Sequence, residues 1–358
     1  MIKVSVIIPI YNMERYLSSG LDSVLSQTLQ EIEIVCVDDG SVDRTPEILK
    51  QYSSQDSRIR ILTQENQGVG TARNNGLKAA SGKYVAFLDP DDYYPDTNVL
   101  RELYEAAEKN CVLICGGSLV EDHDDGKWFR KRFVGNYTNY TFKENGYISY
   151  RDYQYDYGFY RFIYNREFLI QNQIFFPPYI RFQDPPFFVH AMIQANGFYA
   201  LKRVTYCYRA GHQNFSWSEK RICALLSGLV DDLRMSSDAQ LARLHCLTLE
   251  RMLYDFREPI LNGLISRDSH VWELFEAAER ILVPEYVALD IDCKRGLKPL
   301  RQEYERRYTQ SNGFSDSLSN LPLSNRPTLF KKIINRFKLY FRLARKRLYR
   351  LYKPEGLL

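Results

Sequence analysis

Short apolar segments rich in β-branched residues alternate with polar segments over the first third of the chain. In the polar segments, apolar side chains recur at steps of three and four, as in Leu17, Leu21 and Val24, which is typical of amphipathic helices. Strands that alternate with helices build βαβ units, so we predict an α/β fold with a mostly parallel sheet flanked by helices. The predicted strands are 4–10, 32–37, 59–62, 84–88 and 112–114.

Polar residues follow three of these strands at the point where each strand ends. Tyr11 and Asn12 follow the first strand, Asp38 and Asp39 the second, and the segment 89–92 (Asp-Pro-Asp-Asp) the fourth. In parallel sheets, ligands bind beyond the carboxyl ends of the strands. We therefore expect these residues to converge on one ligand site.

The segment 89–92 has a functional and a structural interpretation. Asp89 and Asp91 are separated by one residue, so one can offer oxygen to a divalent metal and the other to a ribose hydroxyl. Mg²⁺ and Mn²⁺ prefer such hard oxygen ligands and complete their shell with substrate phosphates. The structural alternative is a surface turn, because Pro and Asp are common turn residues. We expect Asp92 to cap the following helix.

The segment 38–41 (Asp-Asp-Gly-Ser) also allows two interpretations. A carboxylate at a strand end can accept the imide N–H of uracil, which would make Asp39 a base-recognition residue. The alternative is a turn between strand and helix, with Ser41 or Asp43 as the N-cap. The residues alone leave both open.

Five ordered segments resemble the family 2 inverting glycosyltransferases of GT-A fold. The resemblance covers about the first 190 residues, and nothing beyond about residue 215 contributes to it. A match of all five at the expected spacing is far more specific than any one of them. The segments are VSVIIPIYN (4–12), VDDGSVDRT (37–45), NQGVGTARNNG (66–76), SGKYVAFLDPDD (81–92) and FQDPPFF (182–188).

The resemblance implies a nucleotide-sugar donor, in particular a UDP-sugar, and a Mn²⁺ or Mg²⁺ ion. Asp91 would bind the metal, and Asp184 would be the general base that deprotonates the acceptor hydroxyl. The other residues implied in donor binding are Pro9, Tyr11 on the uracil face, Asp39 on the base edge, Arg73 near the diphosphate, Asp89 on the ribose and His212 near the diphosphate.

The chain departs from the family at the catalytic motif, where Gln183-Asp184 replaces the usual Glu-Asp pair. The base itself is kept, and an ionised Asp needs no raised pKa to accept a proton. We therefore expect an active enzyme. The structural alternative is a helix start with Asp184 as N-cap and Pro185 as the first helical residue.

Two rival functions remain open. Gln183 makes a catalytically inactive, membrane-attached glycan-binding or scaffold protein conceivable. A nucleotidyltransferase would also use paired carboxylates, but it would normally show a phosphate loop rich in Gly and basic residues after the first strand. The segment 9–12 (Pro-Ile-Tyr-Asn) is not such a loop, so this function is less favoured.

Beyond the first strands the chain changes character. The periodicity is lost from 116 to 165, where we expect loops and short strands. The seven cysteines are scattered and form no CxxC pair, which argues against a disulfide framework or a zinc site and fits a reducing cytosol. The predicted divisions are a GT-A domain (1–215), a helical region (216–310), a linker (311–327) and a basic amphipathic helix (328–353).

The last segment concentrates positive charge. From residue 321 to the end there are eleven Lys or Arg and one acid, and no run is long and apolar enough to predict a transmembrane helix. We expect helix 328–353 to lie on an anionic membrane surface, which predicts a cytoplasmic protein attached peripherally to the inner face of the cell membrane and a lipid-linked or surface-glycan acceptor. The alternative is packing on the protein or in a homodimer. Nucleic-acid binding is not expected, because no recognition fold accompanies the tail.

Overall fold

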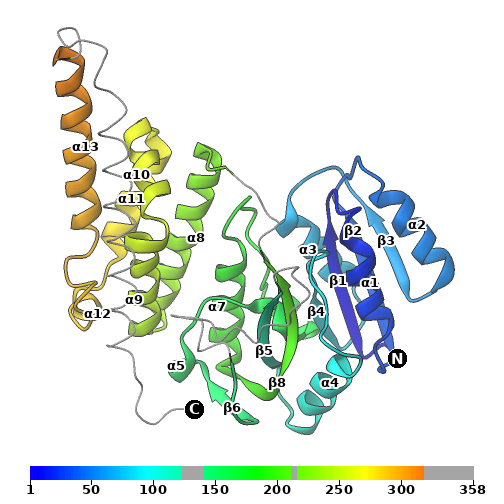
Figure 1. The fold of residues 1–358 in the computed structure, drawn as a ribbon. Helices are drawn as coiled ribbons and strands as arrows, with labels where there is room; N and C mark the ends of the chain where they lie inside the picture. The colour runs from blue at the N-terminus through cyan, green and yellow to red at the C-terminus, as the bar shows by residue number, and fades with distance from the viewer. Residues whose placement is uncertain (123–140, 211–215, 318–358) are drawn as a thin grey trace.

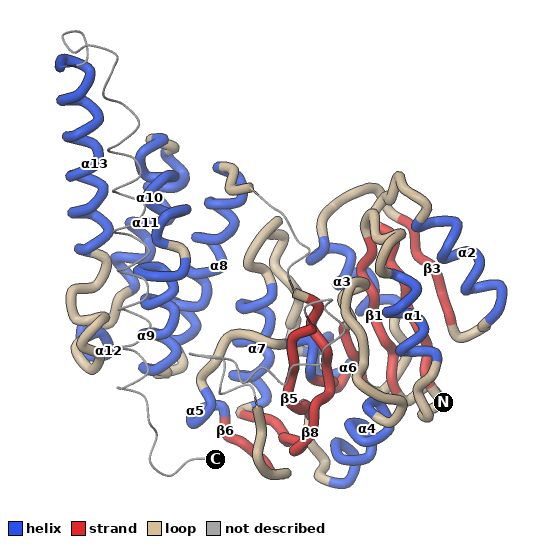
Figure 2. Tube along the Cα trace, in the orientation of Figure 1, coloured by secondary structure: helices blue, strands red, loops and turns tan. Residues whose placement is uncertain are grey.

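The computed structural model describes residues 1–122, 141–210 and 216–317. Strands gather in one half of the molecule and helices alone form the other, as Figures 1 and 2 show. The first half contains the sheet with helices packed on it. The second half is built from the helices that follow residue 218. The two halves have separate apolar cores.

An eight-stranded mixed sheet forms the first half, in the order β3-β2-β1-β4-β7-β5-β8-β6. The pairs among β1 to β4 are parallel, and β5 is parallel to β8, whereas β7 and β6 are antiparallel to their neighbours. This confirms the predicted fold class. The strands are β1 (Val4–Ile10), β2 (Ile32–Asp38), β3 (Ile59–Thr63), β4 (Tyr84–Phe87), β5 (Ile114–Asp122), β6 (Gly146–Ser149), β7 (Phe162–Asn165) and β8 (Gly197–Arg209).

Helices cover the sheet, and β1 and β2 are buried along their whole length. One helix, α3, lies unusually close to the sheet, because a Cβ added at Gly76 would come within 2.4 Å of Ile7 Cγ2. This close approach packs the second half of α3 against the middle of β1. The helices of this half are α1 (Leu17–Leu25), α2 (Thr45–Gln55), α3 (Val69–Ala79), α4 (Val99–Lys109), α5 (Tyr150–Tyr153), α6 (Arg166–Gln171) and α7 (Asp184–Ala195).

The region from 116 to 165 is more regular than its composition indicates. The strand expected at 112–114 is in fact β5, which begins at Ile114 and continues to Asp122. The apolar alternation fails here because Gly116 lies under an aromatic ring: a Cβ added to it would come within 2.0 Å of Phe162. A residue without a side chain is needed at that position, so the pattern of apolar residues cannot show the strand.

The helical half has its own core, formed by residues such as Leu229, Leu249 and Phe275. The last helix, α13, continues to Ser317, so the linker expected from 311 does not begin there. Gly313 and the serines resemble linker composition, but the first proline comes only at Pro322. The elements are α8 (Glu219–Asp238), α9 (Ala242–Glu250), a π-helical turn (Arg251–Asp255), α10 (Arg257–Ser266), α11 (Ser269–Ile281), α12 (Pro284–Val287) and α13 (Lys298–Ser317).

The predicted basic helix 328–353 and the remainder of the predicted linker lie outside the described residues. Among the helices that the structure does describe, none is long and apolar enough to cross a bilayer.

Candidate active site

The segment 89–92 directly follows β4 and is held by the end of β8. Asp92 is 1% exposed, and its carboxylate accepts hydrogen bonds from the Tyr206 hydroxyl and the Arg209 backbone N–H, both at 2.7 Å. The expectation that Asp92 caps a helix is wrong, because α4 begins only at Val99. Asp92 is buried because β8 returns beside this segment and supplies its partners.

Further bonds from β8 fix the backbone of the same segment. The Asp89 N–H donates to the Tyr206 hydroxyl at 3.1 Å, and Arg209 Nε donates to the Asp91 carbonyl at 2.8 Å. Tyr206 therefore links the first and last acid of the segment through one oxygen. Sequence reasoning missed both β8 residues, because they lie more than a hundred positions further along the chain.

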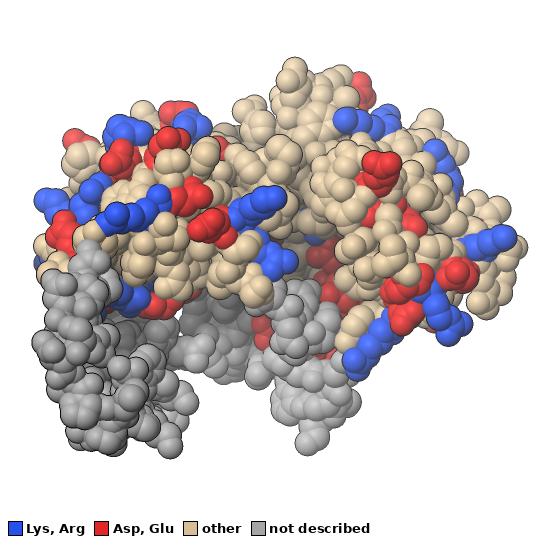
Figure 3. Space-filling model, turned by 90° about the horizontal axis from the view of Figure 1, so that it is seen from above, with Lys and Arg blue, Asp and Glu red and all other residues tan. Residues whose placement is uncertain are grey.

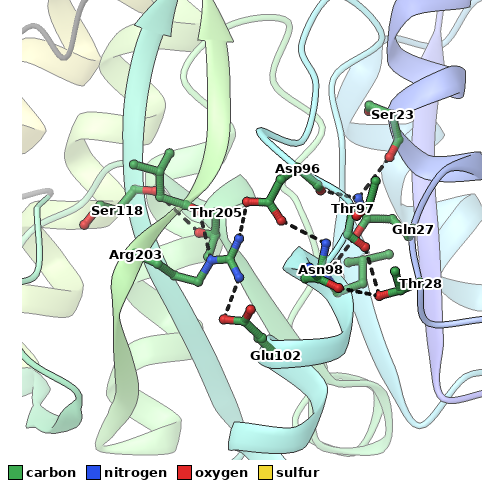
Figure 4. A network of polar contacts seen from close by, with 12 residues as sticks. Ser23, Gln27, Thr28, Asp96, Thr97, Asn98, Glu102, Ser118, Arg203 and Thr205 are labelled. Atoms are coloured by element: carbon green, nitrogen blue, oxygen red, sulfur yellow. Dashed lines mark hydrogen bonds and ion pairs between the residues drawn. The ribbon is translucent and has the colours of Figure 1, made fainter.

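The loop after the segment is also attached to β8, as Figure 4 shows. Arg203 forms ion pairs with Asp96 and Glu102, each at 2.5 Å. Gln27 donates from its side chain to the Asp96 carbonyl at 2.7 Å. The loop that follows segment 89–92 is thus held by Arg203 of β8 and by Gln27, which follows α1.

Arg73 of α3 faces Asp89 across a short ion pair, with Nη2 2.6 Å from Oδ1. The guanidinium is 4% exposed and lies over the rings of Phe159 and Phe176, at 4.7 and 5.1 Å from their centroids. Burial alone would lower the Arg73 pKa, but the charges of Asp89 and Asp184 outweigh it and raise the pKa. Arg73 therefore remains a cation between two predicted site carboxylates.

The acids of the segment share a crowded environment. Burial raises the pKa of Asp89, Arg73 opposes this, and the charge of Asp91 adds to it. Burial and the charges of Asp91 and Asp89 raise the pKa of Asp92 well above its ordinary range. A site of this kind favours a bound proton or an added cation.

Asp184 is the first residue of α7, and Gln183 occupies the N-cap position without making a side-chain cap bond. The expected N-cap role of Asp184 is therefore wrong by one position. The turn before the helix holds Phe182 at a φ of 61°, and this left-handed residue sets where the helix begins. Gln183 is 7% exposed and packs near Gly70 at the start of α3.

Asp39 is 3% exposed and already has several partners. Its carboxylate accepts hydrogen bonds from the Gln64 side chain, the Gln67 N–H and the Gly68 N–H, all at 2.8 Å. Asp39 therefore holds the loop that leads into α3 and Arg73. If Asp39 binds the base edge as predicted, its carboxylate must accept that hydrogen bond in addition to these three.

Tyr11 and Pro9 lie at the end of β1. Tyr11 is 45% exposed, so its ring is accessible to a ligand. Pro9 is buried inside the strand and lies beyond the last pairing of β1 with β4, at Ile7 and Phe87. Proline has no backbone N–H to donate, which fits a position where β1 no longer pairs with β4. The remaining predicted residue, His212, lies outside the described residues.

Two buried acids that sequence reasoning missed lie near Asp184. Asp156 is 0% exposed and forms an ion pair with Arg251 at 2.8 Å. Asp232 is 0% exposed, and neither of its oxygens has a hydrogen-bond partner within the described part of the chain. Burial raises the pKa of both acids, and the charge of Asp184 contributes to each shift.

Seen from above, the surface is hollowed between the two halves, and acidic side chains gather there (Figure 3).

Comparisons with known proteins show which proteins this chain is similar to. Residues 5–171 match the family described as glycosyl transferase family 2. The chain is 34% identical over 209 residues to the uncharacterized glycosyltransferase EpsJ of Bacillus subtilis, which covers 58% of this chain and 60% of EpsJ. It is 39% identical over 124 residues to the putative glycosyltransferase EpsH of the same organism, covering 35% of this chain and 36% of EpsH. These matches thus span less than two thirds of either relative.

Solved structures share the fold at low sequence identity. Staphylococcus aureus TarS 1–349, in complex with UDP, has a TM-score of 0.64 at 21% identity and covers 87% of this chain and 92% of its own. The mannosyltransferase PcManGT from Pyrobaculum calidifontis, in complex with GDP-Man and Mn²⁺, has a TM-score of 0.52 at 17% identity. The match covers 89% of this chain and 88% of the PcManGT chain. The fold is therefore the GT-A fold, and residues 5–171 are similar to the glycosyl transferase family 2.

Proposed function

We propose that the protein is an inverting glycosyltransferase that moves a sugar from a UDP-sugar to a hydroxyl of a lipid-linked or surface-glycan acceptor. The observation that carries this proposal is the ion pair between buried Arg73 and Asp89, which lies just beyond the carboxyl end of β4 and within electrostatic reach of Asp184. The bound UDP in TarS and GDP-Man in PcManGT support a nucleotide-sugar donor.

The acidic segment fits a divalent metal. Two of its three carboxylates, Asp89 and Asp91, offer the hard oxygen atoms that Mn²⁺ and Mg²⁺ prefer, whereas both Asp92 oxygens are engaged by β8. The raised pKa values of Asp89 and Asp92 indicate that the site lacks positive charge for three ionised acids. We assign the metal to Asp91 and the ribose to Asp89. When bound, the metal would stabilise the charge that develops on the departing diphosphate.

Arg73 is suited to bind the donor phosphates. Its Nη2 is engaged by Asp89, but Nε and Nη1 are buried and have no hydrogen-bond partner among the described residues. Leaving such donors unpaired costs about 1–3 kcal/mol each. Phosphate oxygens would satisfy them, because the planar guanidinium matches phosphate geometry. Tyr11 would stack on the base, whose edge Asp39 would bind.

Asp184 would act as the general base. Asp184 is the first residue of α7, so the helix start fixes where its carboxylate lies. Asp184 takes the proton from the acceptor hydroxyl while the hydroxyl oxygen attacks the anomeric carbon. The bond from that carbon to the diphosphate breaks, and the electron pair leaves with the nucleotide. Attack opposite to the leaving group inverts the configuration.

The membrane attachment of this activity belongs to the same proposal. Segment 328–353 would hold the enzyme peripherally on the cytoplasmic face of the membrane, near a lipid-linked acceptor. The eleven basic residues from 321 onward support it.

The experiment that tests the proposal is a transfer and hydrolysis assay with UDP-sugars and Mn²⁺. The wild type should turn over at least one donor, and Asp184→Asn should lower kcat about 10²–10⁴-fold, the usual contribution of a general base. Asp238→Asn, an exposed acid on α8, is the control and should match the wild type. No turnover with any donor, together with intact glycan binding, would instead support the inactive scaffold that Gln183 suggests.

A further inference from the structure

A second cluster of metal-ligating side chains lies in the helical half, outside the proposed active site. Among the residues that the structure describes, Glu250, Asp290 and Cys293 bring their ligand atoms within 4.8 Å of one another. Cys246 lies beside them, because the Cys293 thiol is 3.6 Å from the Cys246 carbonyl oxygen and the two thiols also hydrogen-bond. This group offers two carboxylates and one sulfur atom, and the Cys246 thiol beside it is the candidate for a fourth ligand.

The chain places these four side chains in two pairs of regular spacing. Cys246 and Glu250 are four residues apart on α9, so they lie on one face of the helix one turn from each other. Asp290 and Cys293 are three residues apart in the turn that precedes α13. A pair on a helix combined with a pair on a turn is a common way to build a metal site from two chain segments.

The turn holds its ligands in position before any ion arrives. Asp290 Oδ1 accepts from the Asp292 N–H at 2.7 Å and from the Cys293 N–H at 3.3 Å. The Cys246 thiol is 3.2 Å from the Tyr286 carbonyl oxygen. Bonds of this kind orient ligands and are typical of the second shell of a metal site.

We propose that Cys246, Glu250, Asp290 and Cys293 form a structural site for a thiophilic divalent cation, with Zn²⁺ as the natural occupant. Two thiolates and two carboxylates match tetrahedral zinc, whereas Mg²⁺ and Mn²⁺ disfavour sulfur. Zinc–ligand bonds of about 2.0–2.3 Å would need the ligand atoms, which lie up to 4.8 Å apart, to move closer together. Cys293 is fully buried, and exposed Leu289 and Ile291 flank Asp290, so an ion would enter from the Asp290 side.

This site differs from the CxxC pattern that the cysteine spacing excludes. Its two halves lie 40 residues or more apart, and each contains one cysteine and one acid. A bound ion would join α9 to the turn before α13, and it would stabilise the helical half independently of catalysis.

The test uses the reduced, metal-free full-length chain titrated with Co²⁺ alone. We expect one equivalent to produce a thiolate-to-cobalt charge-transfer absorption, which Zn²⁺ then removes by displacement. The proposed active site cannot give this signal because it has only oxygen ligands, so Asp91→Asn should keep the band. Cys293→Ser should abolish it, and Cys223→Ser, which alters a partly buried thiol outside the cluster, should leave it unchanged.

Glu250→Gln keeps both thiols and removes only a carboxylate, so it remains informative if a cysteine variant fails to fold. We expect its Zn²⁺ affinity to fall by more than the roughly 10–100-fold that loss of a second-shell partner costs. Zn²⁺ should raise the Tm of the wild type, and Mg²⁺ should not. A reduced wild type without the thiolate band, a band that survives Cys293→Ser, or a Cys246–Cys293 disulfide under these conditions would overturn the proposal.

Discussion

At the scale of single residues, Tyr206 has a larger part in the site than its place far along the chain indicates. Its hydroxyl donates to Asp92 and accepts from the Asp89 N–H. Asp92 is fully buried, so few other partners can replace the hydroxyl. One phenol oxygen thus determines how the first and last acids of the segment are oriented.

Tyr206→Phe should therefore leave Asp92 Oδ2 and the Asp89 N–H without this hydrogen-bond partner and lower the free energy of unfolding by about 1–3 kcal/mol. Chemical denaturation measures this. Tyr199→Phe, on the same strand, is the matched control and should be nearly neutral. Equal stability of the two variants would show that the Tyr206 hydroxyl is dispensable.

Arg73 provides a second test at this scale. The guanidinium lies over two aromatic rings while pairing with Asp89, and a Lys ammonium cannot reproduce that planar contact. We expect Arg73→Lys to fold but to bind UDP at least about 10-fold more weakly, since a lost hydrogen bond to a charged group costs about 1.5–3 kcal/mol. Calorimetric titration with UDP measures the affinity. Wild-type affinity in Arg73→Lys would exclude guanidinium–phosphate bonding.

At the scale of elements, α8 and the π-helical turn meet the sheet half through buried charges. Asp156 pairs with Arg251, whereas Asp232 has no hydrogen-bond partner. Burial and the charges of Asp156 and Asp184 raise the Asp232 pKa well above its ordinary value. Asp232 therefore retains a proton in the folded state at a pH where the unfolded chain has lost it.

This difference makes stability depend on pH. A raised folded-state pKa contributes stability that is complete below the unfolded pKa and is lost as the pH rises. We expect Asp232→Asn to be more stable than the wild type at pH 8, with an advantage that shrinks toward pH 5 by up to about 1.4 kcal/mol per pH unit. Tm measured across this range tests it, with Asp238→Asn as the exposed control on α8. Parallel pH curves for wild type and Asp232→Asn would contradict the assignment.

Local pattern predicts some of these elements well and others poorly. The β-branched run of β1 was predicted at its observed bounds, because a buried parallel strand needs nothing but apolar residues. The strand predicted at 112–114 is β5, but its continuation to Asp122 was missed because Gly116 must leave room for Phe162. The contacts of β8 with the acidic segment depend on how the chain returns, which local periodicity does not encode. For the same reason, Arg73 and Asp184 were found only through the resemblance.

At the scale of the whole molecule, the charges are unevenly distributed. The body carries 37 basic and 43 acidic side chains, and the last 38 residues carry eleven basic side chains and one acidic. This distribution supports the proposed attachment of the protein to an anionic membrane surface through segment 328–353.

Replacing Lys331, Lys332, Arg336 and Arg342 by Gln should weaken binding to anionic liposomes on the order of 1,000-fold, since each basic residue near such a surface contributes about 1 kcal/mol. Liposome co-sedimentation measures this. The matched control replaces four exposed lysines of the body, Lys50, Lys109, Lys202 and Lys220. Equal loss in both variants would show that the whole protein, and not the tail, supplies the attraction.

The donor site itself is tested most directly by calorimetric titration of UDP with and without Mn²⁺. We predict that the wild type binds UDP much more tightly with Mn²⁺, that Asp91→Asn loses this dependence, and that Asp184→Asn keeps it because Asp184 acts on the acceptor. If Asp91→Asn binds UDP with the same Mn²⁺ dependence as the wild type, the assignment of segment 89–92 as the donor and metal site is wrong.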